Sequence, residues 1–180
     1  KMQIRSDYPI GTYLSGGIDS SLISAITAKV SKNKLPSFHG CFENYPGFSE
    51  YEFASAVANK NDLDLFKVNP TPREFIEYLP KIIYALDEPI AGPGVFPQFI
   101  VSKLASESVK VVLGGQGGDE LFGGYVRYLV AYLEQALKGS IEGTNEEENH
   151  LVSLSSIVPN LKILNGYQPL MKKFFRNGLF

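Results

Sequence analysis

Residues 10–21 run Ile-Gly-Thr-Tyr-Leu-Ser-Gly-Gly-Ile-Asp-Ser-Ser, and this stretch decides the fold. Residues 10–14 predict a short buried strand, and apolar side chains then recur at helical spacing over residues 22–30. Two glycines, a carboxylate and hydroxyls lie between them. Glycine lets the backbone approach a ligand closely, and the first N–H groups of a helix have no partner within it and favour negative charge. The stretch therefore predicts a phosphate-binding turn between a strand and a helix.

Two common phosphate motifs are excluded at this turn. No Gly-Lys-Ser/Thr follows the glycines, so the turn is not a Walker loop, and the glycine spacing is not GxGxxG. A simpler alternative is a glycine-rich turn in which Asp19 or Ser20 only caps the helix.

Composition limits the classes of function. The 180 residues suffice for one domain with a sizeable core, and 44% hydrophobic with 20% charged residues is typical of a soluble globular protein. A net charge of −2 gives no reason to expect a nucleic-acid partner, and no apolar run is long enough for a membrane. The single cysteine, Cys41, excludes an internal disulfide and favours a cytoplasmic location. Because little precedes the first strand, we expect a fragment of a longer protein.

Further strands are predicted at residues 36–42, 63–68 and 109–113, and helical segments alternate with them. This alternation predicts an α/β fold with a parallel sheet flanked by helices. Thr71 and the residues after it form a capping box that begins one helix, and Pro80 is expected to begin a separate one.

The expected organisation has three parts. Residues 1–138 form the main domain, the polar and acidic residues 139–150 form a linker or loop, and residues 151–180 form a truncated C-terminal segment of the same domain.

A second glycine loop, Gly-Gly-Gln-Gly-Gly-Asp-Glu, occupies residues 114–120 directly after the strand at 109–113. Ligands of parallel sheets bind at the carboxyl ends of strands where the strand order reverses, so the two loops can share one crevice. Asp19 and Asp119 each follow glycines at such a turn. Carboxylates of this kind suit a Mg²⁺ that phosphates and waters also coordinate, although helix capping is again the alternative.

Both loops resemble known motifs. Ser-Gly-Gly-Ile-Asp-Ser at residues 15–20 resembles the pyrophosphate loop of the N-type ATP pyrophosphatases. Residues 111–125, VVLGGQGGDELFGGY, are similar to the LSG-x-G-x-DE-x-FGGY signature of asparagine synthetases. With the Asp-Glu-Pro segment at residues 87–89, the match runs from residue 10 to residue 125. The chain is thus identified as a member of the glutamine-hydrolysing asparagine synthetase family, in its C-terminal synthetase domain.

The resemblance implies a Rossmann-like, three-layer fold of the adenine nucleotide alpha hydrolase type with a partial helical C-terminal extension. It implies an ATP- and Mg²⁺-dependent ligase that adenylates a carboxylate, usually the side chain of aspartate, and releases pyrophosphate. Ammonia then forms the amide, and an N-terminal glutaminase domain, absent from this sequence, supplies it. A homodimer is a possible assembly of the full-length protein.

The resemblance assigns roles residue by residue. The pyrophosphate ligands are Ser15, Gly16, Gly17, Asp19 and Ser20. The adenosine site comprises Leu14, Gly40, Gly114 and Gly115. The metal ligands are Asp19 and Asp119, which act in catalysis together with Gln116 and Glu120 near the acyl group.

Three residues depart from the family pattern. Gly114 stands where serine is frequent, Gln116 where an acidic residue is frequent, and Gly40 where a branched aliphatic residue is frequent. Gln116 therefore leaves the acceptor open: β-lactam-forming or sugar- and peptide-modifying relatives share the adenylation, and a nucleotide-binding module without turnover is the third alternative. His39 and Cys41 are expected to be structural.

Overall fold

The computed structural model describes residues 4–142 except 32, 44–48, 89–91 and 93. Its sheet has four parallel strands: β1 (Ile10–Tyr13), β2 (Pro36–Gly40), β3 (Asp64–Val68) and β4 (Val111–Leu113). Their order is β3-β2-β1-β4, so the chain first builds outward on one side of β1 and then returns to its other side. The strand order therefore reverses at β1 and β4, the two strands from which the glycine loops depart.

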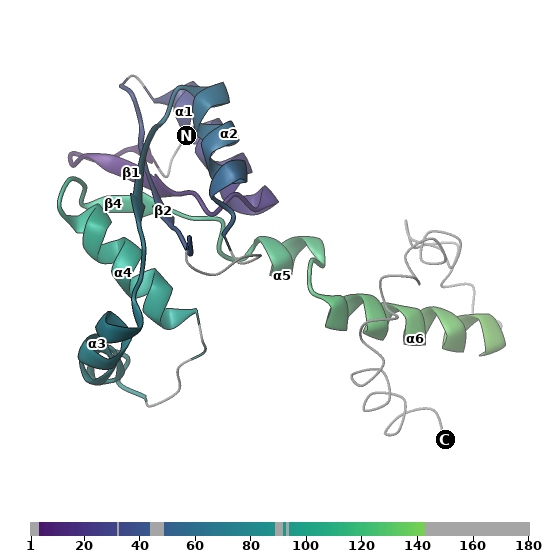
Figure 1. The fold of residues 1–180 in the computed structure, drawn as a ribbon. Coiled ribbons are helices and arrows are strands. Elements are labelled where there is room, and N and C mark those ends of the chain that lie inside the picture. The colour runs from purple at the N-terminus through teal and green to yellow at the C-terminus, as the bar shows by residue number, and fades with distance from the viewer. Residues whose placement is uncertain (1–3, 32, 44–48, 89–91, 93, 143–180) are drawn as a thin grey trace. The chain divides into compact units, whose positions relative to one another are not determined.

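Helices cover both faces of this sheet (Figure 1). On one face, Leu14 at the end of β1 packs against Ala54 and Ala58 of the second helix. On the other face, Phe38 of β2 packs against Val101 of the fourth helix. The helices are α1 (Ile18–Val30), α2 (Tyr51–Asn61), α3 (Pro72–Ala85), α4 (Val95–Ser106), α5 (Gly118–Phe122) and α6 (Val126–Glu142). The predicted fold, a parallel sheet flanked by helices, is confirmed.

The chain forms two compact units, Lys1–Gln116 and Gly117–Phe180, and each is considered by itself. The first contains the sheet and α1 to α4, and the second contains α5 and α6. Helix α6 continues to Glu142, into the range predicted as a linker, and residues 143–180 lie outside the described part of the chain. The division at residues 138 and 150 therefore stays a prediction. Within the described ranges, no helix has the length and apolarity that a membrane crossing requires.

Helix α1 turns small polar side chains toward the sheet. Two of the apolar side chains whose helical spacing predicted this helix, Leu22 and Ile26, are 52% and 50% exposed. Ser24 is buried instead and donates a hydrogen bond to Thr12 of β1 at 3.1 Å. Thr12 also bonds Ser37 of β2 at 2.8 Å. Because serine and threonine are small, they let the start of α1 lie close to the strand that precedes it.

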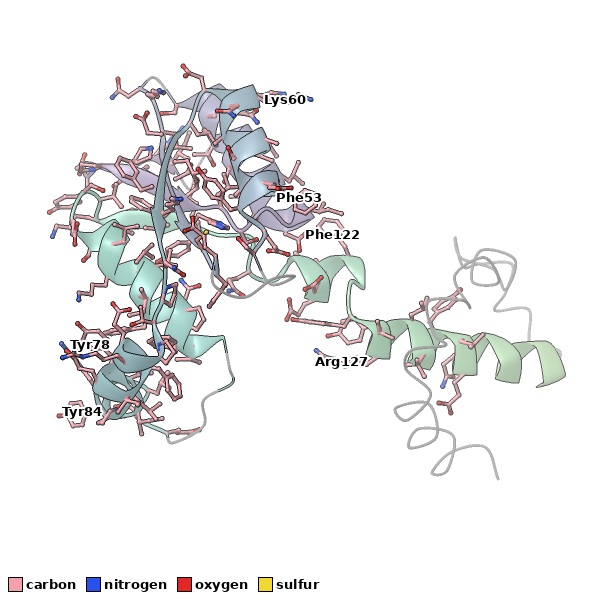
Figure 2. The ribbon with its side chains drawn as sticks, viewed as in Figure 1. Phe53, Lys60, Tyr78, Tyr84, Phe122 and Arg127 are labelled. Atoms are coloured by element: carbon pink, nitrogen blue, oxygen red, sulfur yellow. The ribbon has the colours of Figure 1, made fainter. Side chains whose placement is uncertain are left out.

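Helix α3 begins as predicted but does not end as predicted. The Thr71 capping box is present, with the Glu74 N–H donating to the Thr71 hydroxyl. Pro80, however, lies inside a continuous helix that runs to Ala85. Proline has no N–H, so Pro80 leaves the carbonyl of Ile76 without its helical donor, and Ile76 as a residue is 75% exposed. Near the end of the helix, Tyr84 is 87% exposed (Figure 2).

Candidate functional site

The first glycine loop leads directly into α1. Gly17 is the N-cap and receives no side-chain cap, and the first backbone bond of the helix runs from the Ser21 N–H to the Gly17 carbonyl at 3.0 Å. The N–H groups of Ile18, Asp19 and Ser20 therefore have no acceptor within the helix. Gly17, and neither Asp19 nor Ser20, is the N-cap of α1, and phosphate binding by this turn stays a prediction.

Two serine hydroxyls hold this loop in shape. The Ser20 hydroxyl accepts from the Ser15 N–H at 3.2 Å and donates to the Gly17 carbonyl at 3.1 Å. The Ser15 hydroxyl bonds that of Ser20 at 2.9 Å and accepts from the Gly17 N–H at 3.2 Å. Gly16 between them has a φ of 100°, and a Cβ there would lie 2.9 Å from the Glu50 carbonyl oxygen. The loop is thus preorganised, and the position of Gly16 requires glycine.

The second glycine loop touches the first. A Cβ on Gly115 would lie 2.7 Å from the Ser20 nitrogen and 2.8 Å from the Asp19 Cβ, so the Gly115 backbone rests on the first turn of α1. Gly114 lies beside Tyr13, and Gln116 is exposed. The structure therefore brings Gly115 to Asp19 and Ser20, although about a hundred residues separate the two loops in the sequence.

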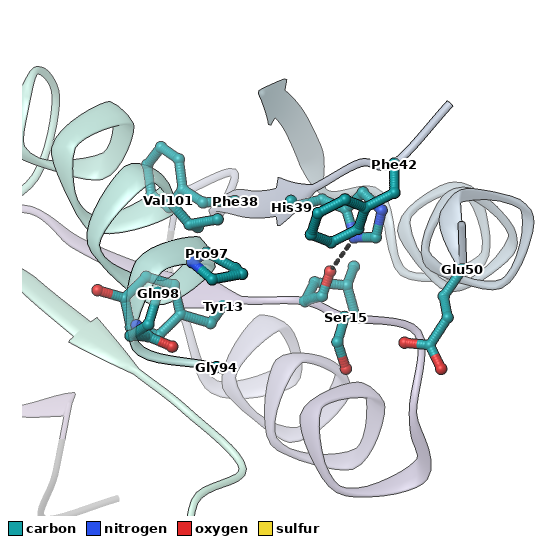
Figure 3. Close-up of a pocket in the computed structure, with 12 residues that line it drawn as sticks. Tyr13, Ser15, Phe38, His39, Phe42, Glu50, Gly94, Pro97, Gln98 and Val101 are labelled. Atoms are coloured by element: carbon teal, nitrogen blue, oxygen red, sulfur yellow. Dashed lines mark hydrogen bonds between the residues drawn. The ribbon is translucent and has the colours of Figure 1, made fainter. Parts of the chain in front are cut away.

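A cavity of about 220 Å³ lies beyond the carboxyl ends of β1 and β2 (Figure 3). Three predicted adenosine- or phosphate-site residues line it: Leu14, Ser15 and Gly40. Other walls come from residues that the sequence analysis missed, including Phe42, Glu50, Pro97, Gln98 and Val101. Pro97, Gln98 and Val101 belong to α4, and no local signal marks them, since the packing of α4 on the sheet alone brings them here. A Cβ on Gly40 would lie 3.0 Å from Val101, so glycine widens the cavity at this point.

His39 is the titratable group buried in this wall, with 2% of its surface exposed. Its Nδ1 lies 2.8 Å from the Leu14 carbonyl oxygen. Burial lowers the pKa of His39, an effect that Lys67 reinforces and that the Leu14 hydrogen bond and Glu50 partly oppose. The imidazole is therefore neutral at pH 7.

The depressed pKa predicts acid sensitivity. Below pH 6.5 the unfolded chain gains a proton on His39 that the native protein resists. The free energy of unfolding should therefore fall as the pH drops from about 6.5 toward the native pKa, by up to about 1.4 kcal/mol per pH unit from this residue. Urea unfolding between pH 7.5 and 5 measures the slope, which His39→Asn should reduce. An unchanged slope in that variant would contradict the assignment.

In the second unit, Asp119 and Glu120 occupy the first turn of α5. Gly117, with a φ of 89°, is the N-cap and has no side-chain cap, so capping by Asp119 is wrong. The Tyr125 hydroxyl donates to Glu120 at 2.8 Å, and this hydrogen bond lowers the pKa of the Glu120 carboxyl. The Arg127 guanidinium lies 3.9 Å from the centre of the Tyr125 ring. The pairing of Asp119 with Asp19 stays a prediction.

Asp19 is the predicted metal ligand that the first unit contains, and one carboxylate suits only an ion whose other ligands are phosphates and waters. Within the described part of the chain, no three His, Cys, Asp or Glu side chains gather as a metal site. The Asp19 carboxylate has no hydrogen-bond or ion-pair partner there, and it stands beside the unpaired N–H groups of α1. Mg²⁺ bound with a nucleotide needs one or two carboxylates, with phosphates and waters as the remaining ligands.

Together, the parallel sheet and the helices on both its faces define an α/β domain whose first glycine loop and cavity lie at the carboxyl ends of its strands. Residues 1–173 match the sequence model of the asparagine synthase family. The match extends over nearly the whole chain, and the chain belongs to this family.

Relatives agree with this family. The chain is 42% identical over 127 residues to asparagine synthetase [glutamine-hydrolyzing] 1 of Bacillus subtilis, covering 71% of this chain and 20% of the relative. It is 33% identical over 187 aligned positions to putative asparagine synthetase [glutamine-hydrolyzing] 2 of Methanocaldococcus jannaschii, covering 99% of this chain and 34% of the relative. The chain thus spans a fifth to a third of these relatives. Among solved structures, the NH3-dependent NAD synthetase of Campylobacter jejuni has a TM-score of 0.46 and 14% identity, covering 86% of this chain and 83% of that one.

Proposed function

We propose that this chain is the ATP-using part of an amide-forming ligase, which adenylates a carboxylate and then transfers the acyl group to ammonia. The observation that carries the proposal is the contact between the two glycine loops, where the Gly115 backbone lies against Asp19 and Ser20. A preorganised anion-binding turn is thereby joined to a second loop at the edge of the sheet where ligands of such folds bind.

The cavity provides a place for the nucleoside. Phe42, Pro97 and Val101 supply apolar walls for a base, and Leu14 and Ser15 lead from the cavity into the phosphate loop. An adenosine in the cavity would place its triphosphate toward the unpaired N–H groups at the start of α1.

In this mechanism the carboxylate oxygen attacks the α-phosphorus of ATP, and the bond from that phosphorus to the bridging oxygen breaks. Pyrophosphate leaves with the electron pair, and an acyl-adenylate remains. Ammonia then attacks the acyl carbon, AMP leaves, and the nitrogen loses a proton to solvent. The N–H groups of Ile18, Asp19 and Ser20 stabilise the charge that develops on the pyrophosphate. No nucleophilic side chain is required.

Asp19 and Asp119 are the residues that would hold Mg²⁺. When bound, the ion supplies charge neutralisation and orientation of the phosphates. The Glu120 carboxylate, held by Tyr125, stays ionised near neutral pH and is available to orient an amino or ammonium group of the acyl substrate.

Exchange of labelled pyrophosphate into ATP by the full-length protein tests the proposal, because exchange requires reversible adenylation. With Mg²⁺ and aspartate we expect exchange that depends on both, and glutamine or ammonia should then give asparagine. A panel of other carboxylates covers the alternative acceptors to which Gln116 points. No exchange with any carboxylate, together with tight ATP binding by calorimetry, would overturn the ligase and support a nucleotide-binding module.

A further inference from the structure

His39 is a buried polar group in the cavity wall that the proposed mechanism does not use. A backbone carbonyl can only accept, so the 2.8 Å contact with Leu14 places a hydrogen on Nδ1. In the neutral ring, Nε2 is then a bare acceptor. Nε2 is fully buried and has no partner within the described part of the chain. Figure 3 shows it on the side of the ring that faces Glu50.

The hydrogen bond from His39 to the Leu14 carbonyl takes the place of the next backbone hydrogen bond between β1 and β2. The Leu14 N–H donates to the Phe38 carbonyl at 2.9 Å, and in a parallel ladder the next bond would run from the Gly40 N–H to the Leu14 carbonyl. Among the described residues that backbone bond is absent, and the His39 side chain occupies the acceptor instead. β1 and β2 therefore separate at this point, and Leu14, Ser15 and Gly40 line the cavity that begins there (Figure 3).

We propose that His39 is a positioning residue. The hydrogen bond from its Nδ1–H fixes the direction of the Leu14 carbonyl, and with it the direction in which the backbone enters the phosphate loop. The same hydrogen bond keeps the ends of β1 and β2 apart, which leaves space for the nucleoside. The identity of that occupant rests on the proposed function. Ser15 is the next residue, and its hydroxyl and N–H bond Ser20 and Gly17. A change in the direction of the Leu14 carbonyl therefore reaches the three hydrogen bonds of the loop that Ser15 makes.

The Nε2 atom without a partner favours a positioning role for His39 over a role in core packing alone. A buried acceptor without a partner is unfavourable, and an apolar side chain of similar size would fill the same space without that cost. The contact that distinguishes histidine from such a side chain is the hydrogen bond to Leu14.

Two variants separate the donor from the ring. His39→Asn keeps an N–H donor near the position of Nδ1 and removes Nε2, whereas His39→Leu keeps the bulk and removes the donor. In the full-length protein with Mg²⁺ and ATP, we expect His39→Leu to raise the Kd and the KM for ATP about tenfold with a smaller change in kcat. His39→Asn should stay within about threefold of the wild type. Urea unfolding of both variants checks that they are folded.

Nitrogen NMR of the imidazole tests the tautomer directly in the wild-type protein. We expect a hydrogen on Nδ1 and a bare Nε2; the chain has two histidines, and His39→Asn identifies the signal. A hydrogen on Nε2, or ATP binding by His39→Leu equal to that of the wild type, would overturn the positioning role, as would equal losses in both variants. If the wild type exchanges pyrophosphate while His39→Leu binds ATP normally, this inference fails and the proposed function stands. If the wild type does not bind ATP, both fail.

Discussion

Gly115→Ala should abolish most of the ATP-dependent activity, by about a hundredfold or more in kcat/KM for ATP. The added Cβ would lie 2.7 Å from the Ser20 nitrogen and 2.8 Å from the Asp19 backbone carbon, and backbone atoms cannot move aside as a flexible side chain can. Either the second loop or the first turn of α1 must shift, and both are parts of the proposed pyrophosphate site. Steady-state kinetics and calorimetry with ATP measure the loss.

Gly114→Ala is the matched control. It makes the same chemical change one residue earlier, but its Cβ would lie 3.5 Å from Tyr13, an ordinary contact. Because Gly114 belongs to the predicted adenosine site, we expect some loss of activity, but one smaller by about tenfold or more than that of Gly115→Ala. Overpacking at Gly115 should also lower the free energy of unfolding by about 1–3 kcal/mol, so urea unfolding accompanies the kinetics. Equal activities for the two variants would show that contact between the loops does not matter for function.

The sequence predicted this contact for a reason that is visible in the structure. Each loop follows a strand directly, β1 and β4 are parallel neighbours, and the carboxyl ends of neighbouring parallel strands lie at one edge. The pattern of strands and helices thus sufficed to place Gly115 near Asp19. Asp119 belongs to the second unit, so the order of the strands does not place it near Asp19.

Other features depend on packing between distant segments, which local patterns do not contain. The periodicity of α1 predicted a helix, but not that its buried face would carry Ser24 bonded to Thr12 while Leu22 and Ile26 are half exposed. Pro80 lies inside the continuous helix α3, where its residue type predicted the start of a new helix. Likewise, the hydrogen bond between His39 and the Leu14 carbonyl cannot be inferred from the sequence without knowing where Leu14 lies.

Asp19→Asn should lower the rate of adenylation about a thousandfold while leaving the fold intact. Asparagine has nearly the same shape, and the Asp19 carboxylate makes no hydrogen bond or ion pair within the described part of the chain, so few native contacts are lost. What is removed is the charge on which a magnesium ligand depends. Pyrophosphate exchange over a range of Mg²⁺ concentrations measures the effect, and the apparent requirement for Mg²⁺ should rise. Asp119→Asn should behave in the same way.

Glu52→Gln isolates the metal role from the helix dipole. Asp19 and Glu52 both lie in the first turn of their helices, α1 and α2, where a negative charge contributes about 0.3–1 kcal/mol to stability. Both substitutions lose that contribution, so their free energies of unfolding should fall by similar small amounts, but only Asp19→Asn should lose exchange activity. If Asp19→Asn stays as active as Glu52→Gln, Asp19 does not bind the metal. If Asp119→Asn is inactive while Asp19→Asn stays active, Asp119 of the second loop is the metal ligand. The first loop then binds pyrophosphate through its N–H groups only.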